Sequence, residues 1–293
     1  MYQFLSVGGG SAGSVLAARL AEKECVTVLL LEAGKSPPKV TDIPTAASFI
    51  QSDIDWNYST APQEHTGAGL VNRSVAWPSG KTIGGSSVIN AMLNLRGNKK
   101  NYDDWAAHGA HGWSYDEVLR YFKKLEDNTD AEYVKNGYHG TGGPVTVSKP
   151  PYDSERKSAV LEAAEEKGYR IGDINGPDAT GFYDLQATIR DGQRCSAARK
   201  RTWLPTTTKK NLDIVSGAFV KKIIIDNSFA KGVVYDFEGK TRTVRAYKEV
   251  ILSAGTVNTA QLLMLSGIGP RQELEKHHAS SSIFFLYICR NVL

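Results

Sequence analysis

Glycine spacing and one acidic residue near the start of this chain of 293 residues could build a nucleotide site. Gly8, Gly10 and Gly13 have the spacing GxGxxG, and Glu32 stands nineteen residues after the last of them. Backbone N–H groups of such a loop can approach a pyrophosphate, and an acidic side chain at that distance can accept hydrogen bonds from a ribose. The pattern predicts dinucleotide binding, and Glu32 disfavours NADP because it would repel a 2′-phosphate.

Apolar runs on both sides of these residues predict the elements that position them. We expect strands over residues 2–7 and 26–31 and a helix over residues 14–21. Gly8 then allows a tight turn, Gly10 lets the backbone approach the phosphates, and Gly13 lets the helix pack closely on the strand. These elements alone fit FAD and NAD equally.

A second glycine-rich segment, residues 80–97, reads GKTIGGSSVINAMLNLRG. Its four consecutive small residues, 84–87, indicate a backbone packed against something flat and bulky, and an isoalloxazine ring fits that need. Asn90 can both donate and accept hydrogen bonds, as a polar ring edge requires.

Together with the opening FLSVGGGSAGS and the late SAGTVNTAQLLMLSGIGP, this segment resembles the glucose-methanol-choline (GMC) oxidoreductase family. Enzymes of that family use FAD to take a hydride from an alcohol. The resemblance implies an α/β fold in which a Rossmann-like FAD-binding domain is interleaved with a partial antiparallel-sheet substrate domain. It also favours FAD over NAD, because an NAD-linked Rossmann dehydrogenase would leave residues 80–97 unexplained.

The resemblance assigns the cofactor to residues from both glycine-rich segments and from two later strands. The flavin portion is assigned to Thr82 and to the turn of residues 90–93, the adenine to the backbone of Val220, and the phosphates to the strand that ends near Ala254. Ile89 stands where some relatives carry a histidine linked to the flavin, so we expect non-covalent FAD. The expected cofactor-binding residues are Gly8, Gly10, Gly13, Glu32, Thr82, Gly85, Asn90, Ala91, Met92, Leu93, Val220 and Ala254.

The expected domains follow the same resemblance. A FAD-binding domain has its first part, including a lid segment, at residues 1–142 and its second part at residues 195–276, with a partial substrate domain at residues 143–194 between them. Residues 277–293 read as an aberrant tail. Within these domains we expect helices over residues 101–124, 154–167 and 259–265, a loop over 128–143 and a buried strand over 249–255.

The proton acceptor of the family is a histidine near the C-terminus, which suits the task because its pKa lies near working pH. The resemblance is expected to stop at Lys276, before that residue. None of the histidines of this chain stands in the family's catalytic context, so no catalytic residue is assigned and we expect no turnover. They are His65, His108, His111, His139, His277 and His278.

Composition excludes several other classes of function. The net charge of +4 and the lack of a long Lys/Arg block give no support for nucleic-acid binding. The three cysteines are far apart and match no disulfide framework or zinc spacing, so no metal is expected. The apolar run at residues 283–289 is too short to span a bilayer. No signal peptide precedes the first strand, but an incomplete N-terminus leaves the compartment open.

Two other functions stay open at this point. The chain is a non-catalytic FAD-binding fragment or pseudo-enzyme if it holds FAD without oxidising alcohols. It is an NAD-linked Rossmann dehydrogenase if no flavin binds. The small-molecule alcohol, whether sugar, choline, aryl or sterol, and the electron acceptor are not identified by these residues.

Overall fold

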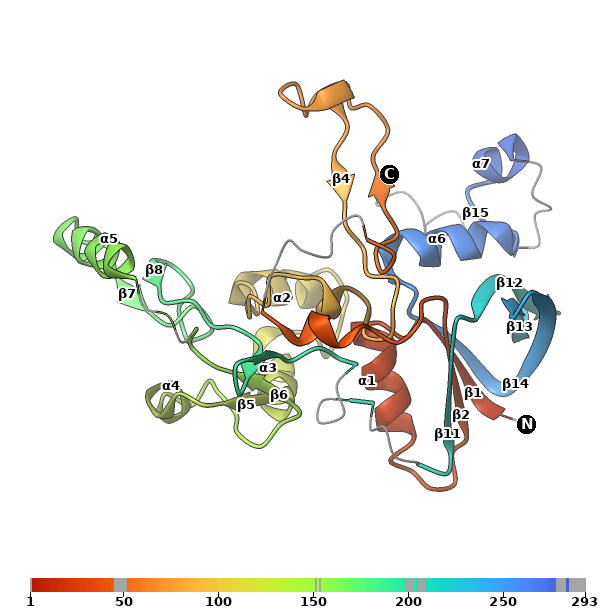
Figure 1. Cartoon of the computed structure of the whole chain (residues 1–293), viewed down its shortest axis with the longest axis horizontal. Helices are drawn as coiled ribbons and strands as arrows, with labels where there is room; N and C mark the ends of the chain where they lie inside the picture. Colours follow the sequence, from red (N-terminus) through yellow and green to blue (C-terminus); the bar gives the residue numbers. More distant parts are fainter. Residues whose placement is uncertain are drawn as a thin grey trace. The chain divides into compact units, whose positions relative to one another are not determined.

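A computed structural model describes residues 2–44, 52–150, 152, 154–198, 203–204, 209–277 and 283–284 of the chain (Figure 1). The chain forms two compact units. Unit 1 takes the described parts of residues 1–41, 47–89 and 196–293, and unit 2 takes those of residues 42–46 and 90–195. The chain thus leaves unit 1 and returns to it, which is the interleaving that the sequence predicts. The predicted domain borders at residues 142, 194 and 276 come from the family resemblance and remain a prediction.

A six-stranded mixed sheet forms the centre of unit 1, in the order β11-β2-β1-β14-β13-β12. β11, β2, β1 and the second half of β14 run parallel, whereas β12, β13 and the first half of β14 pair antiparallel. The mixed α/β sheet confirms the predicted fold class. The strands are β1 (Tyr2–Val7), β2 (Val28–Glu32), β11 (Leu212–Ser216), β12 (Phe219–Asp226), β13 (Phe229–Phe237) and β14 (Lys240–Leu252).

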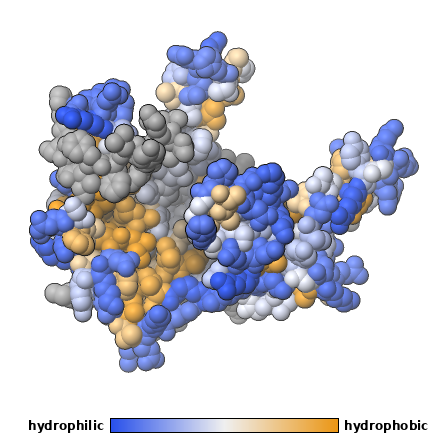
Figure 2. Space-filling model, turned by 180° about the vertical axis from the view of Figure 1, so that it is seen from behind, coloured by the Kyte–Doolittle hydropathy of each residue, from blue (hydrophilic) through white to orange (hydrophobic). Residues whose placement is uncertain are grey.

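Strand alternation places a hydrophobic cluster on each face of this sheet. Leu5 and Val7 contribute to the cluster that α6 (Gly255–Leu265) covers, through Leu262. Phe4, the neighbour of Leu5, packs instead against the cluster that contains Ala17 of α1 (Ser11–Leu20). Every residue of β2 is buried, as expected of a central parallel strand covered on both faces. Hydrophobic side chains also form a patch on the surface of unit 1, over this sheet (Figure 2).

The predicted buried strand over residues 249–255 is wrong in two respects. The strand β14 ends at Leu252, and α6 already begins at Gly255. Glu249 is exposed and residues 250–252 are only half-buried. The reason is that, within the described residues, this half of β14 pairs with β1 alone and has no strand on its other edge.

Unit 2 joins helices to short strand pairs. β5 and β6 are parallel, β7 and β8 are parallel, and β9 and β10 are antiparallel, as are single bridges from Leu93 and Ser148 to Ala187. The elements are α2 (Lys99–Ala107), α3 (Tyr115–Leu125), β5 (Glu126–Asn128), α4 (Ala131–Lys135), β6 (Val145–Val147), α5 (Glu155–Glu166), β7 (Ile171–Gly172), β8 (Phe182–Tyr183), β9 (Ile189–Arg190) and β10 (Gln193–Arg194).

The single helix predicted over residues 101–124 is two helices, α2 and α3. Gly109 and Gly112 both have positive φ, which interrupts the helix, and the Glu117 side chain accepts a hydrogen bond from the Ser114 N–H (3.1 Å) to start α3. The predicted loop over 128–143 contains the short α4, which Asp130 caps through the N–H groups of Glu132 and Tyr133. Helix α5 confirms the prediction over 154–167, with Ser154 as its N-cap.

Short elements complete unit 1. The 3₁₀ turns are η1 (Lys39–Asp42, at the border of the units), η2 (Val71–Arg73) and η3 (Gly85–Val88), the short strands are β3 (Tyr58–Ser59), β4 (Ala76–Trp77), β15 (Ile268–Gly269) and β16 (Ile283–Phe284), and the last helix is α7 (Arg271–Lys276). The predicted tail, 277–293, falls outside the described residues except for His277 and β16. Among the helices in the described part of the chain, none has the length and apolar character needed to cross a bilayer.

Candidate nucleotide site

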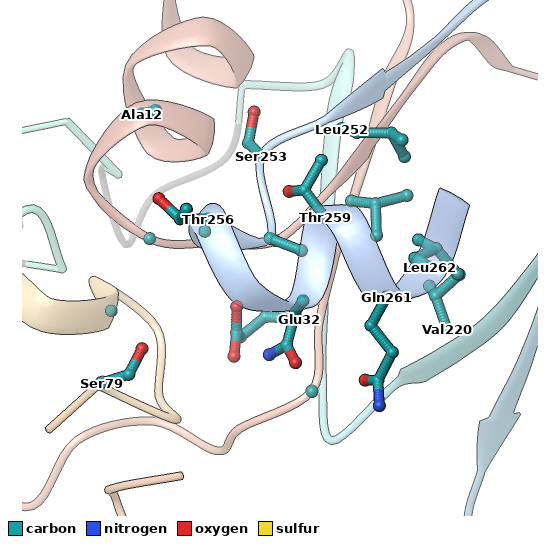
Figure 3. Close-up of a pocket in the computed structure, with 18 of the residues that line it drawn as sticks. Ala12, Glu32, Ser79, Val220, Leu252, Ser253, Thr256, Thr259, Gln261 and Leu262 are labelled. Carbon is teal, nitrogen blue, oxygen red and sulfur yellow. The ribbon is translucent and has the colours of Figure 1, made fainter. Parts of the chain in front are cut away.

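A pocket of about 750 Å³ lies within unit 1, at the carboxyl ends of β1, β2 and β14. Its volume falls in the range of small-molecule sites, roughly 300–1,000 Å³. The first turn of α1, most of the length of α6 and the segment around Gly80 and Gly85 complete its wall (Figure 3). In an open α/β sheet this edge is where ligands bind, because the loops and helix N-termini meet there.

Close backbone packing shapes the turn between β1 and α1. Gly8 has φ +98°, and a Cβ on it would overlap the carbonyl of Ser253. A Cβ on Gly13 would overlap the Gly8 carbonyl oxygen, so α1 can approach β1 only with glycine there. The nearest atom to a Cβ on Gly10 would be the Cα of Gly85 at 3.7 Å. The turn therefore leaves the backbone around Gly10 open to the pocket.

Two helix N-termini face this pocket. Gly10 and Ser11 at the start of α1 line it, as do Ala254 and Gly255 at the start of α6 (Figure 3). Neither helix has a side-chain cap or an acidic residue in its first turn. The free N–H groups and the positive ends of two helix dipoles thus favour an anion at this place.

Glu32 holds the glycine turn in place and lines the pocket. Its Oε2 accepts a hydrogen bond from the Gly9 N–H (2.6 Å) and its Oε1 accepts one from the Gly34 N–H (2.8 Å). Burial raises the pKa of Glu32, although the two N–H groups act in the opposite direction. Each carboxylate oxygen has a further lone pair, so Glu32 can still accept hydrogen bonds from ribose hydroxyls.

The structure brings most of the predicted residues of unit 1 to this pocket. Gly8, Gly10, Glu32, Gly85, Val220 and Ala254 all line it. Gly13 supports the turn from behind, through its contact with Gly8. Thr82 is not among the lining residues: it is fully buried, and its hydroxyl donates to the Lys35 carbonyl (2.7 Å). Its predicted contact with the flavin remains a prediction.

The small residues at 84–87 have a structural role that the sequence analysis did not anticipate. A Cβ on Gly85 would lie 2.7 Å from the Cα of Gly10, and one on Gly84 would lie 2.8 Å from the Ala198 and Val88 side chains. Glycine is therefore required at positions 84 and 85 by the protein's own packing. The two glycine-rich segments contact each other directly.

The turn of residues 90–93 lies in unit 2 and is described there by itself. The Asn90 Oδ1 accepts from the Met92 N–H (3.1 Å) and from the Arg194 Nη1 (2.8 Å), so the side chain closes the turn. Met92 has φ +61° and packs in a small core with Ala187 and Ile189. Asn90, Ala91 and Leu93 are exposed. Their contact with a flavin remains a prediction.

Sequence reasoning missed the aromatic contacts at the mouth of the pocket. Trp56, a lining residue in the lid segment that the resemblance predicts over residues 55–78, stacks on Tyr58 with ring centroids 5.9 Å apart. The Tyr58 hydroxyl donates to the Asn258 Oδ1 (2.5 Å), and the Lys81 Nζ lies 4.7 Å from the Trp56 ring centroid. These contacts tie the lid segment to α6. No spacing rule could have found them, because Tyr58 and Asn258 are 200 residues apart.

The residues of the pocket fit the adenosine diphosphate half of FAD. Two helix N-termini suit a pyrophosphate, Glu32 suits a ribose, and the apolar side chains of Phe219, Val220 and Leu252 suit an adenine. In the described part of the chain, no histidine lines the pocket and no group of side chains forms a metal site.

Comparisons with known proteins agree with this geometry. The chain is 44% identical over 280 residues to a glucose dehydrogenase [FAD, quinone] of Drosophila melanogaster, covering 94% of this chain and 44% of that protein. It is 37% identical over 278 residues to an oxygen-dependent choline dehydrogenase of Brucella anthropi, covering 94% and 49%. Among solved structures, pyridoxine 4-oxidase from Mesorbium loti matches with a TM-score of 0.88 and 33% identity, covering 97% and 55%.

The chain spans about half the length of these relatives. The family profile described as GMC oxidoreductase matches residues 2–291, so the expectation that the resemblance stops at Lys276 was wrong. The profile, the relatives and the fold together assign FAD as the cofactor. The chain belongs to the GMC oxidoreductase family.

Proposed function

We propose that this chain binds FAD without a covalent link, through the pocket of unit 1, and that it forms the cofactor-binding part of an oxidoreductase acting on CH–OH donors. The observation that carries the proposal is the pair of helix N-termini, free of acidic residues, that face one pocket beside Glu32. When bound, FAD accepts the hydride that leaves the carbon of the alcohol. The residues of this chain contribute by binding and orienting that cofactor.

Each group of lining residues has a task in this proposal. The N–H groups at the starts of α1 and α6 bind the pyrophosphate, and the Glu32 carboxylate binds the adenosine ribose. The backbone of Val220 contacts the adenine, and Gly85 keeps the second glycine-rich segment close to Gly10. Thr82 and residues 90–93 are assigned to the flavin by the resemblance.

The substrate is proposed as a small alcohol. The first alcohol to test is glucose, since the Drosophila relative at 44% identity is named a glucose dehydrogenase, and choline is the second, since the Brucella relative is named for it. We expect no turnover by the chain of 293 residues itself, because none of its histidines stands in the catalytic context that the resemblance implies. The chain would then act as the FAD-binding fragment that the sequence analysis kept as its alternative.

The test is to express the chain, incubate it with FAD and separate free cofactor by gel filtration. The proposal predicts a flavin absorption spectrum that travels with the protein and is lost after denaturation, which distinguishes non-covalent binding. The spectrum should stay oxidised when glucose or choline is added without oxygen. A protein peak with no flavin would overturn the binding proposal, and bleaching by an alcohol would overturn the expected inactivity.

A further inference from the structure

Four ionisable side chains meet in the interior of unit 2, and none of them belongs to the pocket residues described above. Arg96, Glu126, His139 and Asp173 come from four separate segments, and their side chains are 9% exposed or less. The Arg96 Nη2 lies 2.6 Å from the Glu126 Oε2. The His139 ring lies between two carboxylates: Nδ1 is 3.0 Å from the Glu126 Oε1, and Nε2 is 2.7 Å from the Asp173 Oδ2.

The two carboxylate contacts of the His139 ring favour its protonated form. A neutral imidazole has one donor and one acceptor nitrogen, whereas the imidazolium donates from both. Both nitrogens of His139 face carboxylate oxygens, so only the imidazolium satisfies both contacts. Its charge also balances the cluster, because Arg96 and His139 then oppose Glu126 and Asp173. The alternative is a neutral ring whose Nδ1 accepts from the Asn128 Nδ2, at 2.9 Å, and faces Glu126 without a proton.

Two further groups lie near the ring. Tyr133 of α4 stacks on the His139 ring with centroids 5.5 Å apart, and the Lys149 Nζ lies 4.8 Å from the Tyr133 ring centroid. Burial alone would lower the pKa of His139, but the hydrogen bonds to Asp173 and Glu126 outweigh it and raise the pKa to about 9.

Asp173 connects the His139 ring to a second segment by hydrogen bonds. Its Oδ1 accepts hydrogen bonds from the Asn175 N–H (3.0 Å) and from the Gln186 Nε2 (2.6 Å). The Asn175 side chain in turn donates to the Asn94 carbonyl (2.9 Å) and accepts from the Arg96 N–H (2.9 Å). The Asn175 Nδ2 also donates to the Gln186 Oε1 (2.8 Å). The backbone of residues 94–96 is therefore held at both ends by the Asn175 side chain, and Asp173 bonds to the Asn175 N–H and to Gln186.

Residues 94–96 continue directly from the turn of residues 90–93. The Asn94 N–H donates to the Gln186 carbonyl (2.8 Å), and the Met92 carbonyl accepts from the Thr188 N–H (2.8 Å). The turn of residues 90–93 is thus followed by backbone that hydrogen bonds from Asn175 and Gln186 hold in place. Among the residues that the structure describes, His139 alone bonds to both Glu126, the partner of Arg96, and Asp173, the partner of Asn175 and Gln186.

We propose that His139 is a positioning residue: clamped between Glu126 and Asp173, it fixes residues 94–96 and thereby the turn of residues 90–93. The consequence for the flavin rests on the proposed function, because that turn is assigned to the flavin by the resemblance. The fixing of residues 94–96 does not depend on it. The two claims can therefore fail separately.

The first test uses the ¹⁵N-labelled chain without FAD. At pH 7.5 we expect NMR spectra of the His139 ring to show protons on both nitrogens. In His139→Gln and Asp173→Asn we expect the backbone amide signals of Asn94 and Arg96 to move, while His111→Gln, at an exposed histidine of the same unit, leaves them in place. An unprotonated Nδ1, or amide shifts confined to the neighbours of residue 139, would overturn the proposal.

The second test adds saturating FAD and records the visible circular dichroism of the flavin. A positioning role predicts that Asp173→Asn and His139→Gln change this spectrum while the Kd for FAD stays within about threefold. A lower melting temperature with an unchanged spectrum would reduce the role to stability and contradict the positioning of the turn.

If the wild-type chain shows no flavin at all, the proposed function fails, and the amide shifts still decide whether His139 fixes residues 94–96. If His139→Gln does not fold, Asp173→Asn, which keeps the size of the side chain, and the wild-type ring spectrum carry the test.

Discussion

The two units fix their functional segments by opposite physical means. Unit 1 shapes its pocket by leaving side chains out: Gly8, Gly13 and Gly85 bring backbone against backbone where a Cβ would collide. Unit 2 fixes its turn by burying charge, with His139 and Arg96 opposite two carboxylates. Glycine packing tolerates no added atom, and a buried ion network tolerates no removed charge. The difference predicts which substitutions each unit withstands.

The largest effect should come from breaking the buried network. Arg96→Met removes one of the two cations of the network and the 2.6 Å ion pair of Glu126 with Arg96, so that His139 alone opposes two buried carboxylates. We expect this to cost about 3–5 kcal/mol in the free energy of unfolding. Lys100→Met is the matched control, since the Lys100–Asp104 pair is exposed and is expected to contribute less than about 0.5 kcal/mol. Urea denaturation of both variants measures the difference. Equal losses would mean that the network does not stabilise unit 2.

The next largest effect should come from adding one methyl group in unit 1. Gly13→Ala places a Cβ against the Gly8 carbonyl, so we expect a loss of about 3 kcal/mol of stability and no detectable FAD binding. Gly69→Ala is the control, because a Cβ there meets nothing within 4 Å and Gly69 does not have positive φ. FAD titration and urea denaturation check both variants. Retained FAD binding in Gly13→Ala would show that close packing of α1 on β1 is not needed.

The stability of unit 2 should depend on pH at both ends of the range. The pKa of His139 is raised from 6.5 to about 9, so its contribution is complete below pH 6.5 and is lost as the pH rises through 9, by roughly 3 kcal/mol. Burial raises the pKa of Asp173, but the hydrogen bond from His139 outweighs burial and lowers this pKa from 3.8 to about 2. The contribution of Asp173 to stability is therefore present above pH 3.8 and is lost as the pH falls through 2. Denaturation across pH 6.5–9.5 tests the first statement. The fall should be absent in His139→Gln, and a fall of equal size there would assign it to another group.

A smaller effect is expected at the acidic residue of the pocket. Glu32→Gln keeps the size of the side chain but replaces one acceptor oxygen with a donor, so either the Gly9 or the Gly34 N–H loses its partner. We expect FAD to bind about tenfold more weakly, which corresponds to about 1.4 kcal/mol. Isothermal titration with FAD measures the change. An unchanged Kd would place Glu32 in the turn only, without a role toward the ribose.

The smallest effect should appear where a polar side chain of unit 2 lies at the surface. Ser154→Ala removes the N-cap of α5, whose hydroxyl accepts from the Arg156 N–H (3.2 Å), at a cost of about 1 kcal/mol. Ser158→Ala, at an exposed position inside the same helix, should be neutral or slightly stabilising. Thermal unfolding separates the two. A loss as large as that of Arg96→Met would mean that burial is not what distinguishes the network.

Sequence reasoning found unit 1 more completely than unit 2. The turn at Gly8 and the strand ending in Glu32 are local patterns, so their elements and their common pocket could be predicted. The helix break at Gly109 and Gly112 was also local, but apolar periodicity on both sides concealed it. The network of Arg96, Glu126, His139 and Asp173 could not be predicted, because its members are far apart in the chain and only the fold brings them together.

We propose above that the pocket of unit 1 holds the adenosine diphosphate half of FAD. Competition titration tests it directly: the chain is saturated with FAD, and ADP or FMN is then added while the bound flavin is followed. We expect ADP to displace FAD, and FMN, which lacks the adenosine, to leave it bound. Displacement by FMN without displacement by ADP would contradict it.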